Sequence, residues 1–251
     1  MRKMAGITKE AQLVLRRALV AQFALNLPAI VEKLFLPKSI LMLYPDVFER
    51  VAIYLKNDTE KAYDPTDDFY CKDICFVLGH SIPCGAQVVD INSNVWIRSV
   101  IISTLRMKKL GPAYRFFLAK GYWSWFRIHT DSRFLGDFNE KGWDRCYLRI
   151  VEMLKRNRNI RGMVGTSWFY DPQLLEISPN LAYLQKRPLL GGAFLLRHGM
   201  SRFDIENATK VSKTRLRLYI EGKYRPIAYS LLWPRKNMIA WAEQYTQEGE
   251  F

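Results

Sequence analysis

Between residues 123 and 172, apolar and polar positions follow three successive patterns. Residues 125–129 are mostly aromatic or branched, and the run is short enough for a β-strand. After a polar break at 130–133, apolar residues recur at helical spacing at Trp143, Tyr147, Ile150, Val151 and Leu154. Residues 160–170 form a second apolar run that ends at Pro172. We therefore predict a strand, a helix and a strand joined by a right-handed crossover, with some parallel pairing in the sheet.

Polar residues predict the ends of this central helix. Asp137 is a candidate N-cap, and Glu140 follows at capping-box spacing. Lys155 and Arg156 fit the negative end of the helix dipole, so we expect the helix to end near 157–159.

The N-terminal third reads as helical. Residues 11–24 place apolar side chains on one face, and further helical runs extend from Pro28 through Leu36 and up to Tyr54. Residues 57–68 are rich in Asn, Asp and Pro and predict a loop. We expect a helical N-terminal section, residues 1–57, packed on an α/β domain of residues 69–251, with the two forming one continuous domain.

The remaining pattern completes the fold prediction. Further strands are expected at 74–78, 86–91, 193–197 and 227–233. Further helices are expected at 94–109, 174–185 with an interruption near Pro179, 209–221 and 237–245. The predicted fold class is α/β or α+β, with a mixed β-sheet flanked by helices and a helical N-terminal section.

Composition and charge narrow the classes of partner. With 49% hydrophobic and 14% aromatic residues in 251, the chain is not of the disordered class. Its formal net charge of +14 favours an anionic partner: a phosphate-bearing cofactor, a membrane surface reached by peripheral contact, or nucleic acid. The aromatic runs 122–126 and 168–170 fit either base stacking or a core.

The four cysteines and the uncharged run 18–31 bear on location. The run is short and contains Gln22, Asn26 and Pro28, so we expect it neither to span a membrane nor to act as a secretory signal. A cytoplasmic, reducing setting is therefore expected. The set Cys71, Cys75, His80 and Cys84 resembles a zinc knuckle, but both outer spacings differ from that pattern by one residue. We expect Cys75 and Cys84 to be buried free thiols, with no metal bound.

Two hypotheses about the chemistry of this protein use the same three residues, His129, Asp131 and His198. In the first, His129 or His198 is a general base and Asp131 is its orienting group. In the second, His129-x-Asp131 with a distant His198 resembles the two-His-one-carboxylate site of non-haem iron oxygenases, which would bind Fe(II).

The loop before the central helix is a candidate phosphate site. Helix N-termini favour anions, and basic side chains add charge. The candidate residues are Arg133, Gly136, Lys141, Gly142 and Arg145.

In the order of its elements, the stretch from about residue 123 to 199 resembles the GNAT-type acyltransferases, although their Arg/Gln-x-x-Gly-x-Gly/Ala signature is missing. The resemblance implies an acyl-CoA whose pyrophosphate lies on this loop. The predicted function is an acyltransferase-like enzyme that uses an acyl thioester of CoA or of a carrier protein. The alternatives are the metal-dependent oxygenase and a non-catalytic basic module that binds RNA or an anionic membrane.

Overall fold

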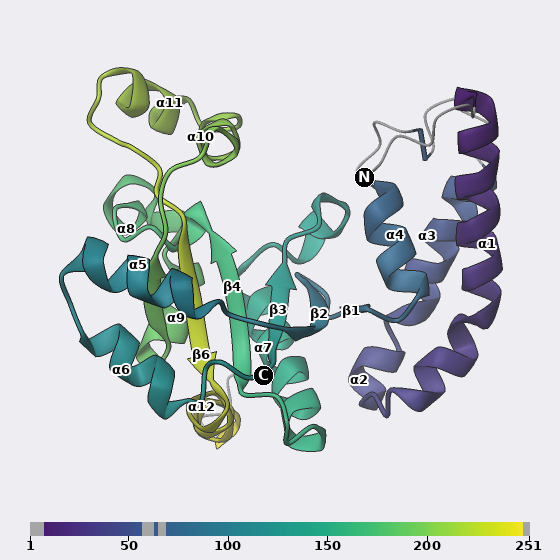
Figure 1. The fold of residues 1–251 in the computed structure, drawn as a ribbon, viewed down its shortest axis with the longest axis horizontal. Coiled ribbons are helices and arrows are strands. Elements are labelled where there is room, and N and C mark those ends of the chain that lie inside the picture. The colour runs from purple at the N-terminus through teal and green to yellow at the C-terminus, as the bar shows by residue number, and fades with distance from the viewer. Residues whose placement is uncertain (1–7, 57–62, 65–68, 248–251) are drawn as a thin grey trace.

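The chain forms an α+β fold around a six-stranded mixed sheet (Figure 1). The computed structural model describes residues 8–56, 63–64 and 69–247, and the backbone but not the side chains of 132–134. In spatial order the strands are β1 (Ser81–Pro83), β2 (Val88–Ser93), β3 (Trp125–His129), β4 (Gly162–Ser167), β6 (Tyr229–Pro234) and β5 (Phe194–Arg197). β3 and β4 pair in parallel, whereas the other neighbours are antiparallel.

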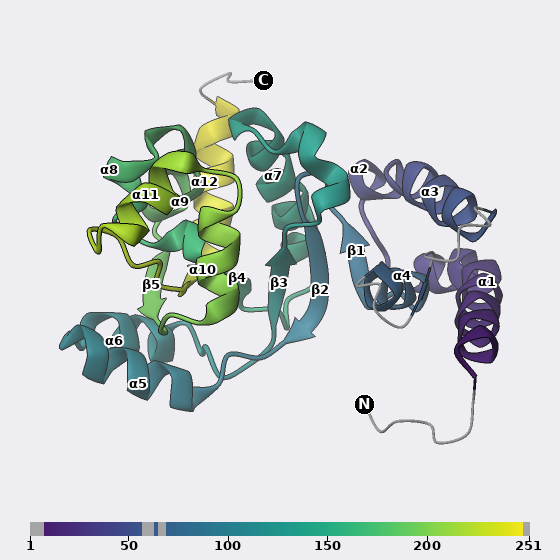
Figure 2. The ribbon, with the colours of Figure 1, turned by 90° about the horizontal axis from the view of Figure 1, so that it is seen from above.

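Helices cover both faces of this sheet. The N-terminal section contains α1 (Lys9–Lys33), α2 (Lys38–Leu41) and α3 (Tyr44–Lys56). The next helix, α4 (Phe69–Val77), packs against α1 although it lies beyond the predicted boundary at residue 57, so from here on we count it with the N-terminal section. The later helices are α5 (Ile97–Met107), α6 (Gly111–Leu118), α7 (Glu140–Arg156), α8 (Leu174–Ile177), α9 (Tyr183–Leu190), α10 (Arg202–Thr209), α11 (Lys213–Ile220) and α12 (Arg235–Gln247). The larger core joins the N-terminal helices, α7 and α12 to one face, while α5 and α6 cover part of the other (Figure 2).

The central prediction is confirmed: β3, α7 and β4 form a crossover with parallel strands. The N-cap prediction is wrong. Asn139 caps α7 by accepting a hydrogen bond from the Gly142 amide at 2.9 Å. Residues 132–137 form a 3-10 turn first, and the Asp137 side chain is held by Arg145 instead. Gly142 is required there, because a Cβ at this position would lie 2.0 Å from the Asp137 carbonyl oxygen.

Three other sequence predictions need correction. The expected strand at 74–78 belongs largely to α4, because a short apolar run fits a buried helix as well as a strand. The two N-terminal runs are one helix that continues through Pro28. The helices α6 and α10 and the short strand β1 were not predicted. Most of the expected loop at 57–68 lies outside the described residues.

The N-terminal section packs on the sheet rather than standing apart. Val20, Ala24 and Leu27 of α1 belong to the same buried cluster as Ile82, Val89 and other side chains of the sheet. Among the described helices, α1 is long and apolar enough to cross a membrane, by length and composition alone. Helix α1 is longer than the uncharged run 18–31, because it includes charged residues on both sides of that run.

Candidate functional site

The sheet face covered by α5 and α6 is apolar at one end and polar at the other. Side chains alternate along a strand, so Arg127 and His129 share this face with the buried Trp125. Thr166 likewise follows Val164 on β4, and Ser230 precedes Leu232 on β6. We call the polar end the polar row; its members are Ser81, Asp90, Arg127, His129, Thr166, Ser230 and His198.

One part of the polar row is a hydrogen-bonded group around the Asp90 carboxylate. His129 Nε2 lies 2.7 Å from Asp90 Oδ2, and Ser81 Oγ donates to Asp90 Oδ1 at 2.6 Å. Burial opposes ionisation of Asp90, but the hydrogen bonds from His129 and Ser81 outweigh it, so the pKa of this carboxyl lies below its usual value. Asp90, not Asp131, is therefore the carboxylate that orients His129.

The other part of the polar row runs from Arg127 to His198. Arg127 Nε donates to Ser93 Oγ at 2.6 Å, and its Nη1 donates to Thr166 Oγ1 at 3.4 Å. The hydroxyls of Thr166 and Ser230 lie 2.6 Å apart, and Ser230 Oγ lies 2.7 Å from His198 Nε2. Hydroxyl groups thus connect the guanidinium of β3 to the imidazole that follows β5.

His198 is the perturbed histidine. Burial is the main cause of its lowered pKa, and the positive charges of Arg106 and Arg127 lower the pKa further. The Arg106 guanidinium of α5 lies against Gly199, next to this ring in the chain. A histidine with a lowered pKa is neutral at pH 7 and can accept a proton.

The structure does not bring His129, Asp131 and His198 together. β4 and β6 separate β3 from β5, which places these two strands roughly 14 Å apart at about 4.8 Å per strand spacing. Asp131 is buried, and its Oδ1 lies 4.0 Å from Lys72 Nζ of α4. Throughout the part of the chain that the structure describes, no group of three His, Cys, Asp or Glu residues is arranged to hold a metal ion.

Some charged side chains of the predicted phosphate loop and the start of α7 already form ion pairs within the protein. Arg145 binds Asp137 at 2.8 Å, and Arg187 of α9 binds Glu140 at 3.3 Å. Lys141 and Gly136 are exposed, and Gly142 is buried. The Arg133 side chain lies outside the described part of the structure. The acidic side chains at the start of α7 are thus paired with arginines, but Arg187 is shared between Glu140 and Asp144, which lies 3.1 Å from the same nitrogen.

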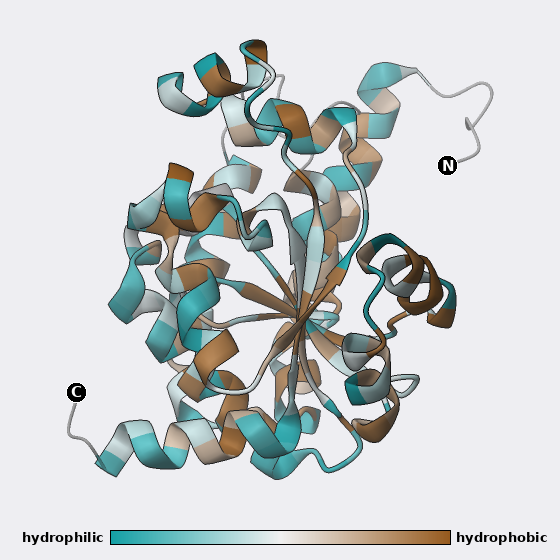
Figure 3. Ribbon diagram, turned by 90° about the vertical axis from the view of Figure 1, so that its left-hand side faces the viewer, coloured by the Kyte–Doolittle hydropathy of each residue, from teal (hydrophilic) through white to brown (hydrophobic). Residues whose placement is uncertain are grey.

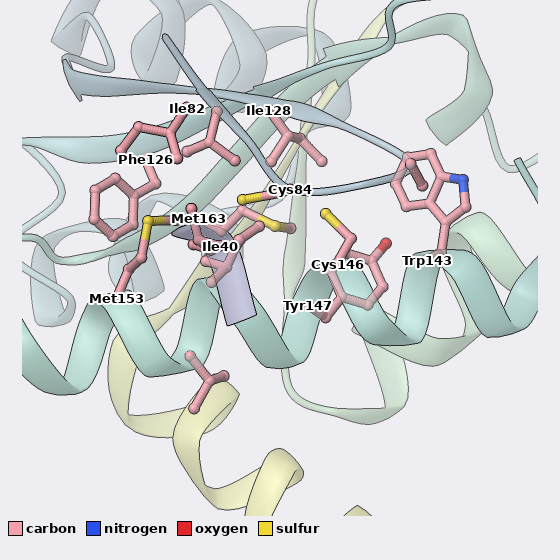
Figure 4. Close-up of a cluster of buried hydrophobic side chains, with 14 of the residues drawn as sticks. Ile40, Ile82, Cys84, Phe126, Ile128, Trp143, Cys146, Tyr147, Met153 and Met163 are labelled. Carbon is pink, nitrogen blue, oxygen red and sulfur yellow. The ribbon is translucent and has the colours of Figure 1, made fainter. Parts of the chain in front are cut away.

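The residues of the knuckle-like pattern are dispersed. Cys71 is exposed and Cys75 half-buried on α4, His80 is exposed, and Cys84 is buried. Cys84 lies in the core cluster that contains Cys146 (Figure 4), and burial together with a hydrogen bond to Cys146 raises the pKa of its thiol. The expectation of a buried free thiol is confirmed for Cys84; Cys75 is free but only half-buried.

A pocket of about 700 Å³ lies on the opposite face of the sheet from the polar row. It opens between the end of α1, the first two strands and the end of α7, with Lys33, His80 and Arg156 among apolar walls. Its further lining residues are Ile30, Leu34, Phe35, Leu36, Leu78, Gly79, Ile82, Ile91, Asn92, Phe126, Met153 and Asn157.

Sequence reasoning missed Asp90, Arg127, Thr166 and Ser230. The alternation within 125–129 already places Arg127 beside His129, whereas the other three require the strand register. In comparisons with known proteins, no family model, no curated protein and no solved structure matches this chain. The functional conclusion therefore depends on the geometry of its own residues.

Proposed function

We propose that the protein is an acyltransferase-like enzyme that uses an acyl thioester of CoA or of a carrier protein, with His198 as general base. The observation that carries this proposal is His198 itself. Burial and two arginines lower its pKa, so it is neutral at pH 7, and its Nε2 reaches an exposed sheet surface through Ser230 and Thr166. A base of this kind is what an attacking amine or hydroxyl needs.

In the proposed reaction, the acceptor attacks the thioester carbonyl and its proton passes to His198 Nε2, directly or through the Ser230 hydroxyl. A carbon–nitrogen or carbon–oxygen bond forms, the carbon–sulfur bond breaks, and the thiolate leaves with the proton that His198 returns. Arg127 lies in the same row and offers positive charge to the oxyanion that develops on the carbonyl.

The start of α7 supports binding of the thioester's phosphate end. It follows β3, at the same end of the sheet as His129, Ser230 and His198, while the helix itself packs on the other face, so the ligand would pass over this end of the sheet. Lys141 is exposed there, and the pairing of Asp137, Glu140 and Asp144 with Arg145 and Arg187 reduces the negative charge that would repel a phosphate. The net charge of +14 favours such an anion over the whole surface.

The test combines calorimetry with a thiol-release assay on the full chain. Acyl-CoA should give saturable heat, and His198→Gln should lower kcat by about 10²–10⁴-fold while leaving binding intact. His80→Gln is the matched control, because His80 is exposed and on the opposite face. Lys141→Ala should raise KM with little change in kcat. If acyl-CoA shows neither saturable heat nor thiol release, the proposal fails.

A further inference from the structure

Residues 96–123 combine hydrophobic and basic side chains without a single acidic residue. The basic residues are Arg98, Arg106, Lys108, Lys109, Arg115 and Lys120; Arg115 is half-buried and donates to the Gly192 carbonyl oxygen at 2.6 Å, so it is held against the protein. The exposed large hydrophobic residues are Trp96, Ile97, Ile101, Leu105, Leu110, Tyr114, Phe117, Leu118, Tyr122 and Trp123. We call this the α5–α6 surface. Trp96 and Leu110 are each 77% exposed and Leu105 is 71% exposed; single exposed side chains of this kind are common, but ten of them within 28 residues form a concentration that indicates an interaction surface.

The two helices present these side chains on defined faces. On α5, Ile97, Ile101 and Leu105 recur every fourth residue and form one exposed stripe, while Val100 and Ser103 are buried on the opposite side. On α6, Tyr114, Phe117 and Leu118 are exposed, and Phe116 is fully buried. The helices lie side by side outside the sheet (Figures 1 and 2). Figure 3 colours the ribbon by hydropathy and shows that hydrophobic and hydrophilic residues alternate along the helices around the sheet.

The positive charge of the α5–α6 surface, together with its apolar side chains, favours one kind of binding partner over others. A second copy of the chain would bring the same positive charges face to face, which is unfavourable. A nucleic acid would leave the aliphatic Ile101, Leu105 and Leu110 without a partner, since bases stack on aromatic rings. A bilayer with anionic lipids satisfies both kinds of side chain, because apolar groups enter the headgroup boundary while Lys and Arg meet phosphates.

We propose that the α5–α6 surface docks this protein on anionic membranes, independently of the function proposed above. Trp96, Leu105 and Leu110 enter the boundary between headgroups and acyl chains, and Lys108 and Lys109, next to Leu110 in the chain, contact lipid phosphates. Tyr114 and Trp123 have the amphipathic rings that favour this depth. The docked α5 also carries Arg106, which lies against Gly199, so the polar row is held close to the membrane surface.

The full chain is tested by co-sedimentation with vesicles of phosphatidylcholine, alone or mixed with phosphatidylglycerol. Binding should require the anionic lipid and weaken with salt. Each basic charge removed should weaken binding about fivefold, so Lys108→Gln/Lys109→Gln should lower it about 25-fold. Trp96→Ser/Leu105→Ser/Leu110→Ser should abolish it, and the fold should survive because all three side chains are exposed.

The matched control is Val211→Ser/Ile220→Ser, which removes similarly exposed side chains on and next to α11 and should leave binding unchanged. Four results would overturn the proposal. These are no vesicle binding, equal binding to vesicles without phosphatidylglycerol, binding of an RNA oligonucleotide in place of vesicles, and loss of binding on Val14→Ser/Leu25→Ser of α1 but not on the triple substitution.

Discussion

Tyr147 of α7 buries a hydroxyl that has no hydrogen-bond partner among the described residues. Its ring packs at steep angles against Trp143, Trp233 and Trp241, with centroids 5.7, 5.2 and 6.0 Å away. Burial raises the pKa of this phenol well above its ordinary value, which reflects the same loss of solvent. Tyr147→Phe keeps the ring contacts and removes only the desolvated hydroxyl.

Burying an unpaired hydroxyl costs about 1–3 kcal/mol, so Tyr147→Phe should stabilise the fold by about 1 kcal/mol. Tyr63 provides the matched control, because its ring is equally buried but its hydroxyl donates to Asp73 Oδ2 at 2.8 Å. Tyr63→Phe deprives a buried carboxylate of a donor and should destabilise the fold by about 1–3 kcal/mol. The same chemical change is therefore expected to have opposite signs at the two sites.

Thermal unfolding followed by circular dichroism measures both variants. For a chain of this size, about 1 kcal/mol corresponds to a Tm change of about 2–4 °C. Tyr147→Phe should unfold above the unmodified protein and Tyr63→Phe below it. A fall in Tm for Tyr147→Phe would show that its hydroxyl does find a partner and would refute the reasoning.

Three further outcomes are expected. Asn139→Ala should cost about 1 kcal/mol in urea unfolding because it removes the cap of α7, and an unchanged midpoint would contradict that role. His198 should titrate below 6.5 by NMR, and Arg127→Gln should raise its pKa; a value at or above 6.5 would exclude the environment described. The unfolded chain has the higher His198 pKa, so protonation of His198 favours unfolding. The contribution of His198 to stability is therefore complete above about pH 6.5 and decreases as the pH falls through the folded pKa.

The central crossover could be predicted because its signals are local. Strand β3 was expected at its observed bounds, and α7 could be recognised from the recurrence of apolar residues from Trp143 to Leu154. The residues of α4 could not be assigned in the same way. A nine-residue apolar helix has too few turns to show its period, and its packing against α1 decides the outcome.

The candidate site could be predicted only in part. His129 and His198 are rare residues at the ends of predicted strands, so the sequence singles them out. Their partners are set by strand register: Asp90 reaches His129 because β2 pairs with β3, and Ser230 reaches His198 because β6 lies beside β5. Asp131 follows His129 closely in sequence, but it lies beyond the strand and approaches Lys72.

The four cysteines form a graded series from surface to core, and this makes them a built-in reporter of opening. Cys71 is exposed and Cys75 half-buried on α4, whereas Cys84 and Cys146 are fully buried between the sheet and α7. An alkylating reagent should modify Cys71 at once, Cys75 more slowly as the N-terminal helices fluctuate, and the last two only when the whole molecule unfolds. Counting modified thiols by mass spectrometry would therefore distinguish local opening of the N-terminal section from global unfolding, without any engineered label.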